Sequence, residues 1–165
     1  MNRTDLEGEL EKLHGASYAW ALGCCRRNRE EAEDVLQESY LKILEGRAAY
    51  RGEAAFKTFL FGVIRRTAAE SRRKEWMRHL RLVTWRPAAT EPAAPPDSDG
   101  QDIARLRGGL ARLATRQREV LDLVFGHDMT IEQAAGTLGI SVGTARVHYE
   151  RGKKRLRLLL GESAP

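Results

Sequence analysis

The chain has 165 residues, of which 42% are hydrophobic and 31% charged, with a formal net charge of +5 and a sequence pI of about 9.5. This length suffices for one ordinary domain or two small ones. The basic balance favours an anionic partner, such as nucleic acid or an anionic membrane surface. The sequence has no apolar run of membrane-spanning length, and its N-terminus lacks the apolar stretch of a signal peptide.

The two cysteines, Cys24 and Cys25, are adjacent in the sequence. Adjacent cysteines rarely form a disulfide, which indicates the reducing environment of the cytoplasm. The four histidines are scattered along the chain, without the short spacing of a zinc motif. We therefore expect a cytoplasmic protein with neither a metal nor another cofactor.

The first 85 residues carry three stretches with helical periodicity and no alternating pattern long enough for a strand, so the predicted fold is all-α. The first helix has its buried stripe at Leu6, Leu10, Leu13, Ser17, Trp20 and Cys24, which makes Cys24 a small core residue. The second helix is predicted near 30–45, with a buried side formed by Ala32, Val35, Leu36, Ser39, Tyr40 and Ile43. The third starts near Ala54 and directs inward Phe56, Phe59, Leu60, Val63, Ile64 and Thr67.

Residues 86–102 differ in composition from the rest of the chain. They hold four of the five prolines, and every charged residue after Arg86 is acidic. Such a segment buries too little apolar surface to offset the entropy lost on ordering. We interpret it as a flexible linker, stiffened by proline, between two small helical domains at residues 1–85 and 103–165.

Residues 130–157 have the pattern of a helix-turn-helix, preceded by a supporting helix from Thr115 to about Phe125. Thr130 is a suitable N-cap with Gln133 at the capping-box position, and Gly139 suits a left-handed turn. Ser141 is the expected N-cap of the second helix, whose buried side comprises Val142, Ala145, Tyr149, Gly152 and Leu156. The supporting helix contributes Val120, Leu121, Val124 and Phe125.

The second helix of this motif is strongly basic. From Val142 to Arg157 it carries six positive side chains and one negative, a net of +5. The major groove of B-DNA accepts one α-helix, whose first turns reach base edges while later cations neutralise phosphates. Candidates for base edges are Arg146 and Glu150; candidates for phosphates are Arg151, Lys153 and Lys154. The alternative is a solvated basic helix on an ordinary helical bundle.

Three stretches together resemble the extracytoplasmic-function (ECF) sigma factors, the small two-domain sigma subunits of bacterial RNA polymerase. The sequence EEAEDVLQESYLKILE (30–45) is similar to the polymerase-binding helix of that family. The sequence AAFKTFLFGVIRR (54–66) resembles the helix entry that shapes the site for the promoter −10 element, and GISVGTARVHYERGKKRLR (139–157) resembles the −35-reading helix. The order of the stretches, the linker position and the length also match.

The resemblance implies a promoter-recognition subunit rather than an enzyme, with core RNA polymerase, promoter DNA and an anti-sigma factor as partners and no membrane contact of its own. The acidic second helix would dock on the clamp helices of the largest polymerase subunit, and the C-terminal domain would meet the flap region. The candidate polymerase-binding residues are Asp34, Gln37, Glu38 and Leu41. Acidic residues on a solvated helix N-terminus are the alternative reading.

The same resemblance assigns the DNA contacts. Residues 48–56 would pocket a flipped −10 base, although Phe56 could equally belong to the core. The basic run 65–86, with eight positive and two negative side chains, would meet the −10 strand, or be a solvated helix end; Trp76 and Trp85 are left unassigned. The −10 candidates are Tyr50, Arg51, Phe56, Arg66, Thr67, Ser71, Arg72 and Arg73. The −35 candidates are Ser141, Thr144, Arg146, Val147, Glu150, Arg151, Lys153 and Lys154.

The sequence departs from the family pattern at several positions. Phe59 stands where the family has Trp, Thr67 where it commonly has Asn, and Ser71 where it commonly has Asp, so the preferred −10 base does not follow from the resemblance. Ala145 replaces the usual Val. Glu150 is unusual on a phosphate-facing helix, and we expect it to point at bases, such as a cytosine amine.

Two other classes of protein compete with this interpretation. The sequences ATRQREVLDLVF and GTARVHY also fit the DNA-binding domain of LuxR-type regulators, but the first 85 residues lack the alternating strands of a receiver domain. Binding of core polymerase without DNA would separate the two. An enzyme is disfavoured because no acid/base pair, phosphate-binding loop or nucleophile motif is present.

Overall fold

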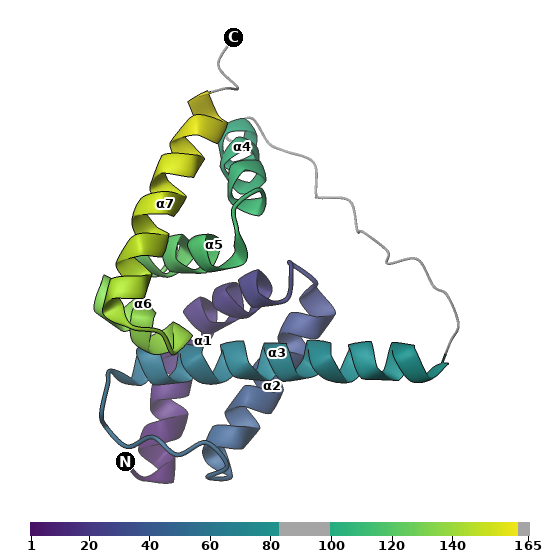
Figure 1. The fold of residues 1–165 in the computed structure, drawn as a ribbon. Coiled ribbons are helices and arrows are strands. Elements are labelled where there is room, and N and C mark those ends of the chain that lie inside the picture. Colours follow the sequence, from purple (N-terminus) through teal and green to yellow (C-terminus); the bar gives the residue numbers. More distant parts are fainter. Residues whose placement is uncertain (83–99, 162–165) are drawn as a thin grey trace. The chain divides into compact units, whose positions relative to one another are not determined.

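The computed structural model describes residues 1–82 and 100–161, and Figure 1 shows its helices. In chain order they are α1 (Arg3–Cys24), α2 (Arg29–Leu44), α3 (Phe56–Leu82), α4 (Gly100–Ala111), α5 (Thr115–Leu121), the π-helical turn η1 (Asp122–Gly126), α6 (Ile131–Leu138) and α7 (Val142–Gly161). Every regular element in the described ranges is a helix, which confirms the all-α prediction. Residues 86–99 of the expected linker, and Trp85, lie outside these ranges.

The helices belong to two compact units. One contains α1, α2 and α3 together with residues 133–140, and the other contains α4, α5, η1 and α7. The first three residues of α4, 100–102, fall within the stretch predicted as linker, so that part of the predicted linker is helical. None of the helices in the described ranges is both long and apolar enough to cross a membrane.

The first two helices begin at side-chain caps. Asn2 forms a capping box with Asp5, in which the Asn2 side chain accepts from the Asp5 amide and the Asp5 carboxylate accepts from the Asn2 amide. Asn28 caps α2 by accepting a hydrogen bond from the Glu31 amide. Each cap satisfies amide groups that the first helical turn leaves unpaired, so these caps fix where the helices start.

The core of the first unit forms where α1, α2 and α3 pack on one another. Trp20 is its largest fully buried residue, and its ring stacks on Phe61 at a centroid distance of 5.7 Å. The Trp20 indole N–H donates to the Phe61 carbonyl at 3.0 Å, so the one polar atom of this side chain is satisfied. The predicted core positions Leu10, Val35 and Leu60 are buried as expected. Tyr40 and Phe59 are only half-buried.

The end of α1 corrects the prediction for the two cysteines. Cys25 is 1% exposed, whereas Cys24, the predicted core residue, is half-buried. The helix ends at Cys24, and Cys25 has φ −101° as its C-cap, so the helical stripe no longer sets which side chain points inward. The two following residues, Arg26 and Arg27, have φ of 51° and 65° and turn the chain toward α2.

The core of the second unit lies between α7 and the two helices α4 and α5. Leu113, Leu121 and Leu159 are buried there, with Leu110, Tyr149 and Leu156 packed around them. Gly152 allows α7 to approach α5 closely, because an added Cβ would lie 3.1 Å from Leu121. This confirms the predicted inward position of Gly152. Helix α4, which packs against this core, was not predicted from the sequence.

Two predicted core positions in this unit are exposed. Phe125, predicted to support the recognition helix, does stack on Tyr149 of α7 but is 65% exposed, because the supporting helix ends at Leu121 and continues as the π-helical turn η1. The wider π turn rotates the later residues relative to an α-helical stripe. Val142 is 36% exposed, because it is the first residue of α7 and lies at the N-terminal end of that helix.

The turn between α6 and α7 has the predicted backbone conformation. Gly139 has φ +65°, and the Ile140 amide donates to the Ala135 carbonyl at 3.1 Å, as in a Schellman-type helix end. Ser141 then caps α7, because its hydroxyl accepts from the Thr144 amide at 3.1 Å. The glycine, the Ser141 cap and the helix bounds therefore agree with a helix-turn-helix at 131–161.

Candidate nucleic-acid interface

The candidate polymerase-binding residues share one side of α2. Asp34, Gln37, Glu38 and Leu41 recur at spacings that place them on adjacent turns, and all but Glu38 are exposed, while Glu38 is intermediate. Leu41 is a large apolar residue with 41% exposure. The opposite side of α2 is buried through Ala32, Val35 and Ile43. The helix thus presents an apolar residue framed by polar and acidic ones to solvent.

Glu38 is held in place by Arg47. The Arg47 guanidinium donates to the Glu38 carboxylate at 2.9 Å and also pairs with Glu45 at 2.8 Å. The hydrogen bond from Arg47 lowers the pKa of Glu38 from its ordinary value. Glu38 is therefore ionised at neutral pH, and its charge is partly matched by a cation within the chain.

The loop before α3 has an aromatic cluster rather than an open aromatic pocket. Tyr50 contacts Phe56 and Phe59, each at a centroid distance of 5.2 Å, and its hydroxyl donates to the Ala54 carbonyl at 2.6 Å. Phe56 is 8% exposed, which favours the core reading for this residue. Tyr50 is half-buried and Arg51 is exposed, so these two remain the accessible −10 candidates of this loop.

The predicted −10 residues of α3 differ in exposure. Arg66 and Arg73 are exposed, and Ser71 is intermediate. Arg72 is intermediate and donates to the carbonyl of Cys24 at the end of α1. Thr67 is only 4% exposed and accepts a hydrogen bond from Lys42 at 3.2 Å. The structure therefore brings Arg66 and Arg73 to the surface and turns Thr67 toward α2.

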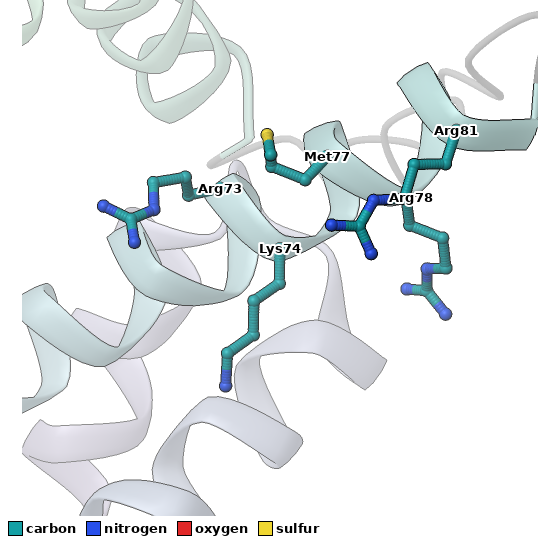
Figure 2. A pocket seen from close by; sticks show the side chains of 5 residues that line it. All are labelled: Arg73, Lys74, Met77, Arg78 and Arg81. Carbon is teal, nitrogen blue, oxygen red and sulfur yellow. The ribbon is translucent and has the colours of Figure 1, made fainter.

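The C-terminal half of α3 carries cations and exposed apolar side chains together. Figure 2 shows an open hollow along this stretch, lined by Arg73, Lys74, Met77, Arg78 and Arg81. Trp76 is 65% exposed and Leu80 58% exposed on the same helix. Cations suit phosphates, and an exposed indole can stack on an unpaired base. Of the two residues left unassigned by sequence, Trp76 is thus an accessible stacking surface.

The start of α7 presents the expected base-reading residues. Thr144, Arg146 and Val147 are exposed, with Ser141 at the N-cap. Arg146 donates to the Glu132 carboxylate at 3.2 Å. The Glu132 carboxylate accepts a hydrogen bond from the backbone amide of Glu132 and another from Arg146, and these bonds, in that order, lower its pKa from the ordinary value. Glu132 is a member of this surface that the sequence analysis missed.

Further along α7 the cations are not equivalent. Arg151 and Lys154 are exposed. Lys153 is intermediate: its ammonium lies 4.5 Å from the Tyr149 ring centroid and 3.5 Å from the Glu150 carboxylate. Tyr149 in turn stacks on the exposed Phe125 at 5.9 Å. Lys153 is therefore held by a cation–π contact and an ion pair within α7.

Lys42 is the other residue that sequence reasoning missed. It bonds Thr67 and Glu70 of α3, which lie 25 and 28 positions away in sequence. No local pattern in the sequence predicts such a pairing; the sequence shows only that Lys42 lies one helical turn after Glu38.

In the described ranges, no group of three or more His, Cys, Asp or Glu side chains is placed so that it could hold a metal ion.

Comparison with known proteins places both parts of the chain in one family. The Sigma-70 region 2 family matches residues 10–78, and the Sigma-70, region 4 family matches residues 103–156. The RNA polymerase sigma factor CarQ of Myxococcus xanthus is 33% identical, over 82% of this chain and 78% of that protein. The ECF RNA polymerase sigma factor ShbA of Streptomyces griseus is 32% identical, over 93% of this chain and 90% of that protein.

Solved structures show the same fold. The sigma factor RpoE of Bartonella quintana, in complex with the anti-sigma factor NepR, aligns with a TM-score of 0.73 and 25% identity, covering 97% of this chain and 99% of its own. CnrH, in complex with the cytosolic domain of CnrY, aligns with a TM-score of 0.69 and 21% identity, over 99% and 92% of the two chains. A LuxR-type regulator does not account for the region 2 match at 10–78. The chain therefore belongs to the sigma-70 family, as an ECF sigma factor that recognises promoters for bacterial RNA polymerase.

Proposed function

We propose that three surfaces divide the work of promoter recognition. The exposed side of α2 docks on the clamp helices of core polymerase. The α3 residues from Arg66 onward, with Tyr50 and Arg51, take up the −10 strand. The start of α7 reads the −35 duplex. Residues 1–85 and 103–165 are then the two functional domains, and residues 86–102 the tether between them.

The observation that carries the docking proposal is the exposed Leu41 among Asp34, Gln37 and Glu38. An apolar residue surrounded by polar ones is typical of a protein–protein interface, where the apolar centre is desolvated and the rim stays wet. A solvated helix N-terminus explains the acidic residues but gives no reason for an exposed leucine two turns later. Glu38 adds a negative charge to this rim, although Arg47 already matches part of it.

The DNA proposals rest on which cations are free to meet phosphates. On α3, Arg66 and Arg73 are exposed, and the arginines of Figure 2 extend the cationic surface. On α7, Arg146 and Val147 occupy the early turns that reach base edges, and Arg151 and Lys154 the later ones that reach phosphates. Buried Thr67 and Phe56 would act on the −10 pocket only through the residues they support.

Two weak DNA sites on one tether gain affinity through effective concentration. We therefore expect the free protein to bind promoter DNA weakly, and the polymerase-bound protein to bind it well. An anti-sigma factor is the expected inhibitor, because the solved relatives named above are held by the anti-sigma factor NepR and the cytosolic domain of CnrY. The protein acts in the cytoplasm, contacts the flap region through its C-terminal domain, and performs no catalysis of its own.

A pull-down of purified core polymerase tests the docking surface. The variant Gln37→Ala/Glu38→Lys changes two residues of that surface, and Glu11→Lys makes the same charge reversal at an exposed position of α1. We expect the wild type and Glu11→Lys to retain core polymerase and the double variant to lose it. Equal retention by all three proteins would refute docking through α2.

A further inference from the structure

Lys42 connects the expected docking helix to the expected −10 helix. Its ammonium donates to the Glu70 carboxylate at 2.6 Å and to the Thr67 hydroxyl at 3.2 Å. The Lys42 side chain is 17% exposed, against 55% for Glu70, so the lysine is the more buried partner of the pair. The bond therefore draws Glu70 toward α2 and places a positive charge beneath the surface of α3.

Glu70 stands among cations where negative charge is unfavourable. Together with Ala69, Arg73 and Lys74 it lines an open hollow on α3. Arg73 and Lys74 also line the neighbouring hollow of Figure 2. An uncompensated carboxylate at this place would repel the phosphates of an approaching strand. A paired carboxylate leaves the two cations dominant.

We propose that Lys42 is a positioning residue for capture of the −10 strand, acting by neutralising Glu70 and holding it against α2. The inference rests on the function proposed above for α3. Lys42 touches no DNA itself in this arrangement, because its ammonium is committed to Thr67 and Glu70. It sets the charge and position of the surface that does.

A purely structural role for Lys42 predicts a different outcome for the double variant. If Lys42 only ties two helices together, then removing its partner Glu70 as well cannot repair the loss of Lys42. If Lys42 acts by neutralising Glu70, then replacing Glu70 by an uncharged residue makes Lys42 dispensable. A double-mutant cycle between the two positions separates these cases.

The experiment uses full-length protein bound to core polymerase and a fluorescent single strand from the −10 region of a promoter that the wild-type holoenzyme opens. The variants are Lys42→Met, which keeps the apolar stem without the charge, Lys42→Arg, Glu70→Gln, and Lys42→Met/Glu70→Gln. Lys12→Met is the matched control, since Lys12 pairs with Glu9 at 2.7 Å on the exposed surface of α1. Affinity for core polymerase and the thermal unfolding midpoint are measured beside strand affinity.

We expect Lys42→Met to weaken strand binding roughly tenfold, the scale of one uncompensated charge near the surface, with unchanged affinity for core polymerase. Lys42→Arg, the double variant and Lys12→Met should bind within about twofold of wild type. The inference is overturned if Lys42→Met binds the strand normally, or if the double variant binds as poorly as Lys42→Met. A wild-type holoenzyme that forms but takes up no −10 strand would instead overturn the proposed role of α3, and this inference with it.

Discussion

The guanidinium of Arg146, on the expected recognition helix, donates a hydrogen bond of 3.2 Å to the carboxylate of Glu132, the second residue of α6. Both side chains are more than half exposed, so the pair adds little to stability. Its importance is geometric, because it restrains the orientation of an arginine that we expect at a base edge. The acidic partner also offsets part of the attraction of α7 for any DNA phosphate.

We therefore predict that Glu132→Gln binds DNA more tightly and less selectively. The freed Arg146 and the lost negative charge both favour non-specific phosphate contacts. Fluorescence anisotropy with the −35 duplex and a scrambled duplex, each with the same holoenzyme, measures the selectivity as a ratio. In an Arg146→Ala background the loss of selectivity should vanish, while the tighter binding that comes from the lost negative charge should persist. An equal gain on both duplexes would show that Glu132 changes charge alone and does not position Arg146.

The two cysteines should differ sharply in reactivity. Burial, reinforced by the Glu31 carboxylate, raises the pKa of the Cys25 thiol to about 12. The thiolate is the reactive form, and it appears only as the pH approaches that value, so at pH 8 the Cys25 thiol stays almost entirely protonated. Cys24 is half-buried. We predict that iodoacetamide labels Cys24 first in the native protein and Cys25 only after unfolding, as read by mass spectrometry. Rapid labelling of Cys25 in native Cys24→Ser would contradict this.

Trp20 should be the most sensitive position of the first unit. It is 1% exposed, stacks on Phe61 and donates to its carbonyl. Trp20→Ala should lower the free energy of unfolding by about 3–5 kcal/mol, because it leaves a large cavity. Trp20→Phe keeps a ring in place and loses the hydrogen bond, at about 1–2 kcal/mol. Urea unfolding followed by circular dichroism measures both, and a similar cost for the two variants would argue against the stacked geometry.

Gly139 should be needed for its backbone conformation alone. An added Cβ would have no neighbour within 4 Å, yet φ is +65°. Gly139→Ala should therefore cost about 1–2 kcal/mol of stability, from the left-handed conformation rather than from a clash. Gly139→Asn should cost less, because asparagine tolerates that region. Equal stabilities of the Ala and Asn variants in thermal unfolding would count against this turn geometry.

The helices and most of the core could be predicted because periodicity and caps are local signals. Trp20, Leu60 and Ala145 are buried where the helical spacing places them, and Ser141 caps α7 as its position indicates. Periodicity fails where the helix itself changes. Cys25 replaces Cys24 in the core because α1 ends there, and Phe125 turns outward after the π-helical turn begins.

The partners of the site residues could not be predicted in the same way. Lys42 meets Glu70 only because α2 packs on α3, and Arg146 meets Glu132 across a tight turn. The sequence contains many charged residues that could form such pairs. Only the packing of the helices determines which of them meet. The helical pattern correctly placed Thr67 inside, where it is 4% exposed, but no local signal identified Lys42 as its partner.

The most direct measurement of the central claim is transcription from a promoter library by core polymerase reconstituted with this protein. The −35 and −10 blocks are randomised independently, and the initiating sequences are read for wild type and Arg146→Ala. We predict that wild type selects one sequence in each block, and that Arg146→Ala changes the −35 selection while leaving the −10 selection intact. An unchanged −35 selection, or a change confined to the −10 block, would contradict the assignment of promoter reading to the start of α7.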